Sequence, residues 1–157
     1  MNPISVIAND PPPIIIDTRE RKAYSFSGFS AYVASLHTGD YSLEGHTEKV
    51  CVERKSATDA YGCVGTNRKR FGDCLKRLGE IERPCIVVEC SLQEFCNPPP
   101  RTRITPAQAV GSYISWSCQY RIPVFFCGSR EYAERVTLRW LMAYWKHVVK
   151  GGATCNH

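Results

Sequence analysis

The spacing of apolar residues changes repeatedly along this chain, and that change limits the folds that it can form. In the first third, short apolar runs of strand length dominate, such as Ile14–Asp17 and Lys49–Glu53. Further along, Phe71, Leu75 and Leu78 follow helical spacing on one face. Another apolar run at 85–90 then precedes two more helical stretches. Strands that alternate with helices predict an α/β domain with a mixed, largely covered sheet.

The boundaries of these elements follow from local signals. We predict strands at 14–17, 31–36, 41–43, 49–53, 85–90 and 122–127, and helices at 68–82, 105–120 and 129–150. Pro84 ends the first helix, Thr105-Pro106 is a capping residue followed by proline, and Ser129 caps the last helix. We expect a flexible glycine-containing loop at 62–67, an extended lead-in over the first dozen residues and a frayed tail.

Composition narrows the class of protein. A chain of 157 residues with 43% hydrophobic residues fits one globular domain. No apolar run approaches the ~18 to 20 residues of a membrane span, and the N-terminus lacks the features of a signal peptide. We therefore expect an intracellular protein, in the cytoplasm or nucleoid or in a nucleus, and neither secreted nor membrane-bound. The net charge of +5 permits a polyanionic partner without establishing one.

Nine cysteines are an odd number, and no two of them form a C-x-x-C pair. Most lie in apolar runs, so we expect reduced thiols that pack as small hydrophobic side chains. The alternative is a zinc site formed by Cys85, Cys90 and Cys96, or by Cys155 with His157. Neither spacing matches the usual pairs of zinc ligands.

Four carboxylates lie at or near the ends of predicted strands: Asp17, Asp40, Glu53 and Glu89. Charged groups beside buried strands need a partner, and ligand sites in α/β proteins gather at the carboxyl ends of strands. One such acid alone would cap a loop or pair with an arginine. Four together predict a site for a hard divalent cation, Mg²⁺ or Mn²⁺, because these ions prefer oxygen ligands.

Glu53 and Lys55 are two residues apart in a predicted strand, so their side chains share a face. Asp40 precedes Glu53 by 13 residues, which is enough for a strand, a turn and a return strand. The pattern predicts that Asp40 and Glu53 hold a metal ion. The Lys55 ammonium group would orient a water molecule or stabilise charge on a phosphate. This is the minimal chemistry for hydrolysis of a phosphodiester.

A longer motif surrounds these residues. Gly39-Asp40, followed by Glu53-Arg54-Lys55 and Asp59, resembles the GD-x(n)-ERK-x-x-x-D signature of the XPF-type structure-specific endonucleases. Residues 15–20 are similar to the opening strand of that family with its D-x-R-E element, and residues 84–89 to its P-x-x-L-I-E strand. The resemblance covers roughly residues 14–145.

The resemblance implies a restriction-endonuclease-like fold and Mg²⁺- or Mn²⁺-dependent cleavage of DNA at forks, flaps or four-way junctions, in repair or recombination. It implies that Asp40 and Glu53 are metal ligands and that Lys55 is the catalytic lysine. The remaining site residues that it implies are Asp17 and Glu20, which would complete the acidic catalytic site, and Arg54 and Asp59, which would support it through a phosphate contact or an ion pair.

Basic residues suggest where DNA binds. Arg68, Lys69 and Arg70 open the predicted helix after the glycine-containing loop, which suits phosphate contact. A plain solvated helix start is the alternative. Family members often add a tandem helix-hairpin-helix module, and this sequence ends about seven residues after its last predicted helix. We therefore expect one nuclease domain over 1–157, with its core at about 14–150, and no such module.

The last two predicted helices carry more apolar residues than one buried stripe requires. This excess predicts a homodimer, or a heterodimer with a DNA-binding partner protein. Two other functions stay open. One is a catalytically silent DNA-binding or scaffold subunit, although such paralogues typically lose the acid or lysine that is intact here. The other is a restriction-like nuclease without branch preference, which only a substrate profile would separate.

Overall fold

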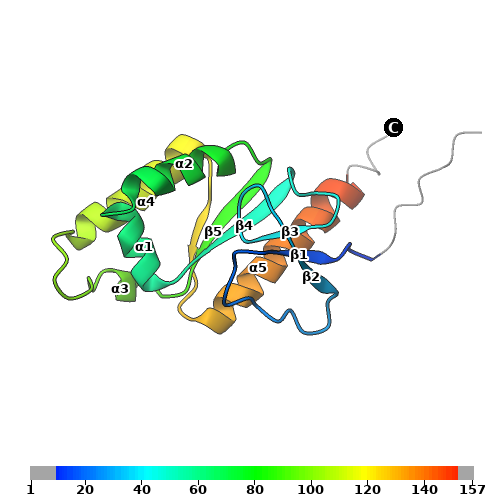
Figure 1. Ribbon diagram of the computed structural model, residues 1–157, viewed down its shortest axis with the longest axis horizontal. Coiled ribbons are helices and arrows are strands. Elements are labelled where there is room, and N and C mark those ends of the chain that lie inside the picture. Colours follow the sequence, from blue (N-terminus) through cyan, green and yellow to red (C-terminus); the bar gives the residue numbers. More distant parts are fainter. Residues whose placement is uncertain (1–9, 152–157) are drawn as a thin grey trace, which may run out of the picture.

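Six short strands form one mixed sheet in the order β2-β1-β3-β4-β5-β6 (Figure 1). They are β1 (Ile14–Asp17), β2 (Ala31–Ala34), β3 (Tyr41–Leu43), β4 (Val50–Lys55), β5 (Arg83–Val88) and β6 (Val124–Phe126). Strand β3 runs antiparallel to its neighbours β1 and β4, and the other neighbouring pairs are parallel. This computed structural model describes residues 10–151. Its mixed sheet flanked by helices confirms the predicted α/β class.

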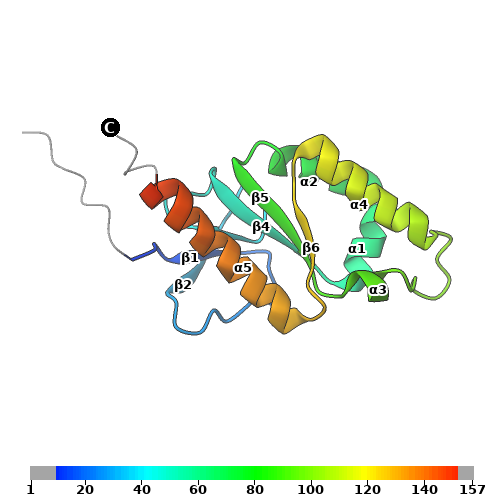
Figure 2. The same ribbon diagram turned by 180° about the vertical axis from the view of Figure 1, so that it is seen from behind.

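Helices cover both faces of the sheet. They are α1 (Ala57–Val64), α2 (Arg68–Leu78), α3 (Leu92–Phe95), α4 (Pro106–Tyr120) and α5 (Arg130–Tyr144), which continues as a π-helical segment at Trp145–Lys150. Figures 1 and 2 show α1, α2 and α4 together on one side of the sheet and α5 on the other. Within residues 10–151, no helix combines the length and apolarity needed to cross a membrane.

The alternation of side chains along β4 decides what faces the site. Cys51 belongs to the core under α1, α2 and α4, whereas Val50 and Val52 belong to the core under α5. Because successive residues of a strand point to opposite faces, Glu53 and Lys55 follow Cys51 to the α1–α2 side. Arg54 points to the α5 side, where its guanidinium group meets Glu89.

The segment after β4 differs from the prediction. Residues 57–64 form α1, so the predicted loop at 62–67 is wrong for its first three residues. The Ser56 hydroxyl caps this helix by accepting a hydrogen bond from the Asp59 N–H. Four buried residues anchor it: Ala60, Tyr61, Cys63 and Val64. Burial of that face outweighs the weak helix propensity of Gly62. The short helix α3 was also missed, and β2 and β6 are shorter than predicted.

Most of the apolar excess in α4 and α5 is buried in the core. Tyr113, Trp116, Leu141 and Tyr144 are buried. Of the six aromatic residues in α4 and α5, Tyr132 is the exposed one, at 58%. Helix α5 needs a wide apolar face because it contacts β3, β4 and β5, and α4 needs one because it packs on α1 and α2. Residues 1–9 of the lead-in predicted over the first dozen residues lie outside the described residues. So do most of the predicted tail and the Cys155–His157 alternative.

Candidate active site

Asp40, Glu53 and Lys55 line one cavity of about 340 Å³. Glu53 and Lys55 come from the end of β4, and Asp40 comes from the loop just before β3. The Asp40 N–H donates to the Val52 carbonyl at 2.8 Å, and Tyr41 pairs with Val52 across the antiparallel strands. This pairing confirms that the chain returns to place Asp40 beside Glu53.

Gly39 makes the turn into Asp40 possible. Its φ is +78°, in the left-handed region that other residues rarely adopt. A Cβ atom at this position would lie 3.1 Å from the Cys51 Cβ and 3.2 Å from its Sγ. A glycine before Asp40 is therefore required by backbone conformation and by the close approach of β4.

The two carboxylates each keep one oxygen available. Asp40 Oδ2 accepts the Arg54 backbone N–H at 2.7 Å, and Glu53 Oε1 accepts from Lys55 Nζ at 2.7 Å. Within residues 10–151, Asp40 Oδ1 and Glu53 Oε2 accept no hydrogen bond. Burial, and then the charge of Glu53, raise the pKa of Asp40 to about 8. The Glu53 charge thus opposes ionisation of Asp40, and a cation between the two carboxylates would relieve that repulsion.

This donor set fits Mg²⁺ or Mn²⁺. In the part of the chain that the structure describes, no three His, Cys, Asp or Glu side chains gather closely enough to hold a metal ion by themselves. Mg²⁺ does not need such a cage, since it commonly takes one or two carboxylates and completes its shell with water and phosphate oxygens. Asp40 and Glu53 supply that minimal set through their free oxygens.

Lys55 is held as an ammonium group. Burial acts to lower its pKa, but the adjacent Glu53 carboxylate and its hydrogen bond outweigh burial, so the pKa lies above the ordinary value. Lys55 Nζ also lies 5.0 Å from the centre of the Phe71 ring. A charged lysine in this position can stabilise developing negative charge and cannot act as a general base.

Helix α2 supplies one wall of the cavity. Asn67, Arg70, Phe71, Cys74 and Arg77 all line it, at spacings of three and four residues along one helical face. Asp59 and Cys63 line it from α1. Two further residues that the sequence predicted for the site, Asp59 and Arg70, therefore line the same cavity as Asp40, Glu53 and Lys55.

Arg68 and Lys69 lie elsewhere. Arg68 Nη1 donates to the Ser112 hydroxyl at 3.0 Å, and its guanidinium group lies 5.0 Å from the centre of the Trp116 ring. These contacts tie the start of α2 to α4 and direct Arg68 away from the cavity. Lys69 is exposed and does not line the cavity.

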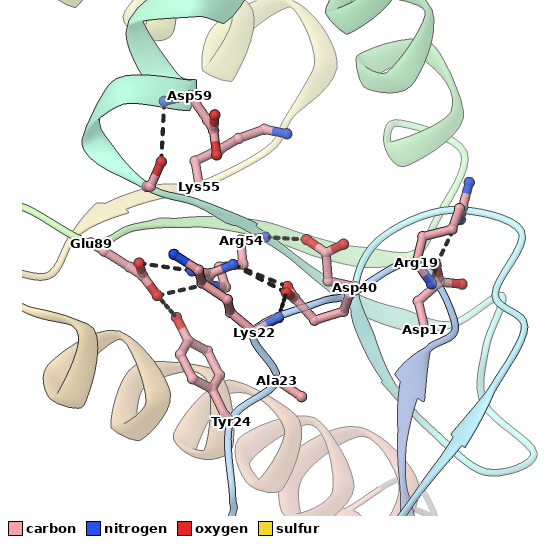
Figure 3. A network of polar contacts seen from close by, with 12 residues as sticks. Asp17, Arg19, Lys22, Ala23, Tyr24, Asp40, Arg54, Lys55, Asp59 and Glu89 are labelled. Carbon is pink, nitrogen blue, oxygen red and sulfur yellow. Dashed lines mark hydrogen bonds and ion pairs between the residues drawn. The ribbon is translucent and has the colours of Figure 1, made fainter.

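Arg54 is the centre of a polar network on the α5 side (Figure 3). Its Nε donates to Glu89 Oε1 at 2.6 Å, and its Nη1 lies 3.2 Å from Glu20 Oε1. Arg130 Nη1 and the Tyr24 hydroxyl also donate to Glu89 Oε1, at 3.0 and 2.9 Å. Of the two roles predicted for Arg54, the structure shows the ion pair.

Asp17 and Glu20 do not line the cavity. Asp17 is 1% exposed, and its two oxygens accept from Arg19 and from the Leu36 N–H. Burial acts to raise the pKa of Asp17, but these hydrogen bonds together lower it. Glu20 accepts from Arg54 and from the Lys22 N–H. Both acids are therefore occupied by cations and backbone donors, and their predicted catalytic role stays a prediction.

Among the basic residues and histidines that line the cavity, sequence reasoning missed three: Arg19, His37 and Arg77. Arg77 had a readable signal, because it lies seven residues after Arg70 on the same helical face. Arg19 lies within the D-x-R-E element, whose acids alone were singled out. His37 had no such signal, since only the fold of the loop before Asp40 brings it to the cavity.

Comparison with known proteins adds a family to this geometry. A family model described as "ERCC4 domain" matches residues 16–139. The DNA repair protein rad16 of Schizosaccharomyces pombe is 32% identical over 99 residues, which are 59% of this chain and 11% of that protein. The DNA repair endonuclease XPF of Cricetulus griseus is 32% identical over 83 residues, 50% of this chain and 9% of that protein. The chain thus spans a small part of these relatives.

Solved structures share the fold. XPF from Aeropyrum pernix superimposes with a TM-score of 0.67 at 21% identity, covering 83% of this chain and 60% of the other. XPF from the same organism in complex with DNA gives a TM-score of 0.69 at 22% identity, covering 86% and 66%. At such identity the likeness establishes the fold, and the chemistry must be argued from the residues of this chain.

Proposed function

The chain belongs to the ERCC4 domain family, and from this premise we propose that it is a divalent-metal-dependent endonuclease that hydrolyses DNA phosphodiester bonds, preferentially at branched structures. Membership agrees with the resemblance to XPF-type nuclease domains. The observation that carries the proposal is the cavity that Asp40, Glu53 and Lys55 share. Two carboxylates with free oxygens beside a charged lysine are the groups that phosphodiester hydrolysis requires.

Each group has a distinct task. Asp40 and Glu53 would hold the Mg²⁺ or Mn²⁺ ion. When bound, that cation would supply Lewis acidity beside the phosphate at neutral pH. Lys55 keeps its proton and stabilises the negative charge that develops on the phosphate in the transition state. The Arg54 N–H holds Asp40 in place, and Arg70 and Arg77 attract the DNA backbone along the α2 wall.

Cleavage of labelled DNA with and without Mg²⁺ or Mn²⁺ tests this proposal. We expect metal-dependent cutting that Asp40→Ala, Glu53→Ala and Lys55→Ala each reduce by about 100-fold or more. Glu48→Ala, at an exposed position outside the cavity, is the matched control and should cut normally. Wild-type protein that cuts neither branched nor linear DNA would falsify the enzyme proposal and favour a silent DNA-binding subunit.

Branch preference requires its own comparison. Forks, flaps, four-way junctions and linear duplex of equal length should be cut at different rates, with branched DNA preferred at least tenfold. Equal rates on all four would support a restriction-like nuclease instead. Product mapping at nucleotide resolution would show whether the cut lies near the branch point.

We also propose that the protein acts as one nuclease domain inside the cell and that it pairs with a second chain, either its own copy or a DNA-binding protein. Exposed Leu92 and Ile114 support an interface, because they border an apolar groove of about 410 Å³ between α3, α4 and β6. If the second chain is its own copy, light scattering at micromolar concentration should give the mass of a dimer. Ile114→Asp should return the monomer while the melting temperature stays near that of the wild type.

A further inference from the structure

Arg19 is held beside the proposed metal site by three fixed contacts. Its Nε donates to Asp17 Oδ1 at 2.6 Å, its backbone N–H donates to the same oxygen at 3.0 Å, and its Nη2 donates to the Leu36 carbonyl at 3.0 Å. Asp17 Oδ2 in turn accepts the Leu36 N–H at 2.7 Å. These bonds close a ring between the end of β1 and the chain after β2, so the guanidinium plane has one orientation.

The other edge of that guanidinium group remains available. Arg19 Nη1 makes no hydrogen bond to residues 10–151, and the Arg19 side chain is 66% exposed although its partner Asp17 is 1% exposed. Arg19 lines the cavity together with Asp40 and Glu53. Figure 3 shows its side chain extending beyond Asp17 rather than folding back over it. A salt bridge that served the fold alone would not need to present this free edge to the cavity.

The charge of the cavity defines what would bind there. Four cations line it, Lys55, Arg19, Arg70 and Arg77, and they face the carboxylates of Asp40, Glu53 and Asp59. The hydrogen bond from Arg19 to Asp17 raises the pKa of Arg19, and the negative charges of Asp40 and Glu53 add to this effect. Once a divalent cation occupies the two metal carboxylates, the positive groups dominate, and an oriented arginine edge matches a phosphate diester.

We propose that Arg19 binds a backbone phosphate of the DNA at the cavity and that Asp17 is the positioning residue that orients it. This inference rests on the proposed nuclease function, whose substrate it details. It gives Asp17 a task that differs from the predicted one, because a carboxylate with both oxygens occupied acts through its arginine rather than on a metal ion or a reacting atom.

The test is a salt titration of DNA binding, measured by fluorescence anisotropy on a labelled fork at a fixed concentration of Ca²⁺ in place of Mg²⁺, so that a divalent cation is present at the carboxylates while cleavage is suppressed. The slope of log K against log salt between about 50 and 200 mM reports the number of phosphates contacted. Arg19→Gln should lower this slope by about 0.9. In cleavage assays with Mg²⁺ it should raise KM and leave kcat within about threefold. Arg19→Lys should retain most of the slope, because its charge remains.

Variants of Asp17 distinguish a residue that only orients Arg19 from one that acts directly on the DNA. Asp17→Asn should weaken binding less than Arg19→Gln does, and the double variant should bind no more weakly than Arg19→Gln alone. The double variant removes both charges together, so it also serves if Arg19→Gln leaves Asp17 unpaired and fails to fold. Arg139→Gln, at an exposed position on α5, is the matched control and should leave the slope unchanged.

The experimental outcomes distinguish a failure of the Arg19 phosphate contact from a failure of the proposed nuclease function. An unchanged slope in Arg19→Gln, or wild-type protein without measurable affinity for DNA, overturns the inference, whether or not DNA is cut. Additive losses in the double variant, with a fall in kcat for Asp17→Asn, would make Asp17 a direct participant and overturn its positioning role. A lowered slope in a protein that never cuts DNA keeps the phosphate contact and overturns the nuclease.

Discussion

The backbone N–H of Arg54 donates a 2.7 Å hydrogen bond to Asp40 Oδ2, while the Arg54 guanidinium group binds Glu89 on the opposite face of the sheet. One residue thus orients a proposed metal ligand with its main chain and anchors the end of β4 with its side chain. Glu89 is itself joined to β4, since its N–H donates to the Lys55 carbonyl at 2.9 Å. The position of Asp40 therefore depends on a network that never touches the cavity.

Asp40→Asn should stabilise the protein in the absence of metal. The folded state holds a proton at Asp40 up to about pH 8, whereas the ordinary pKa is 3.8. The folded state therefore binds more protons between these values, and wild-type stability falls as pH rises through that range. An asparagine can accept the same Arg54 backbone N–H and does not ionise, so the stability of the variant should not fall in this way. We expect its unfolding free energy to exceed that of the wild type by roughly 2 kcal/mol near pH 8. Urea titrations at several pH values would measure it.

Addition of a divalent metal ion is the control for the Asp40→Asn prediction. Added Mg²⁺ should stabilise the wild type in proportion to its occupancy and leave Asp40→Asn unchanged. Glu48→Gln, at an exposed position, should respond to pH and to Mg²⁺ as the wild type does. An Asp40→Asn variant less stable than the wild type at about pH 8 without metal would contradict the proposed repulsion between Asp40 and Glu53.

Lys55→Met should lower kcat by about 100-fold or more with little change in affinity for Mn²⁺, because Lys55 stabilises charge and holds no metal. Glu53 keeps the lysine protonated, so the wild-type rate should not fall between about pH 8 and pH 9 through loss of this proton. Lys55→Arg should recover part of the rate, and Lys146→Met should cut DNA normally. An alkaline fall in rate that disappears in Lys55→Arg would show that the lysine loses its proton in this range.

Arg54→Met should destabilise the protein by about 3–5 kcal/mol, because Glu20 loses its ion pair and Glu89 keeps only the pair with Arg130. The Arg54 and Glu89 side chains are 11% and 10% exposed, so solvent screens the pair only weakly. The double variant Arg54→Met/Glu89→Gln should recover part of the loss. Thermal and urea unfolding would measure it, with Arg139→Met as the control. Equal stabilities of Arg54→Met and the wild type would refute the anchoring role.

The Arg54–Glu89 ion pair also predicts that the stability of the protein depends on pH in the acid range. Burial acts to raise the pKa of Glu89, but its bonds to Arg54 and Tyr24 lower it below the ordinary value of 4.5. The stability that it contributes is present above that value and is lost as pH falls through the lowered pKa. The difference in unfolding free energy between the wild type and Glu89→Gln should therefore be full at neutral pH and shrink in acid. A constant difference across pH would show that charge is not the cause.

Gly39→Ala should lower the free energy of unfolding by more than the left-handed backbone conformation alone explains. The positive φ accounts for about 1–2 kcal/mol, and the new Cβ would press on Cys51 at 3.1 Å. Gly45→Ala is the matched control, because Gly45 has a φ of +76° and open space around it. We expect Gly39→Ala to be the less stable of the two and to lose most cleavage through displacement of Asp40. Equal costs in urea unfolding would show that the contact with Cys51 is unimportant.

Much of the fold was predictable because its signals are local. The strand at 14–17, the helix that starts at Pro106 and the Ser129 cap follow from residue spacing and capping chemistry, and the structure has them where they were expected. Helix α1 was not predicted, since its glycines suggest a loop and only the burial of Tyr61 and Val64 against α4 and the sheet makes it stable.

The amino-acid sequence by itself determined which groups could perform the chemistry: the order Gly39-Asp40, Glu53, Lys55, and the two-residue period that sends Glu53 and Lys55 to one face. Only the tertiary structure decided which acids stand free. Asp17 and Glu89 are carboxylates at or near strand ends as Asp40 is, and Glu20 lies three residues after β1, yet arginines pair with all three. No local pattern records a pairing between Arg54 and a residue 35 positions away. A carboxylate becomes a metal ligand or a structural anchor according to which cation reaches it, and that depends on how distant strands meet.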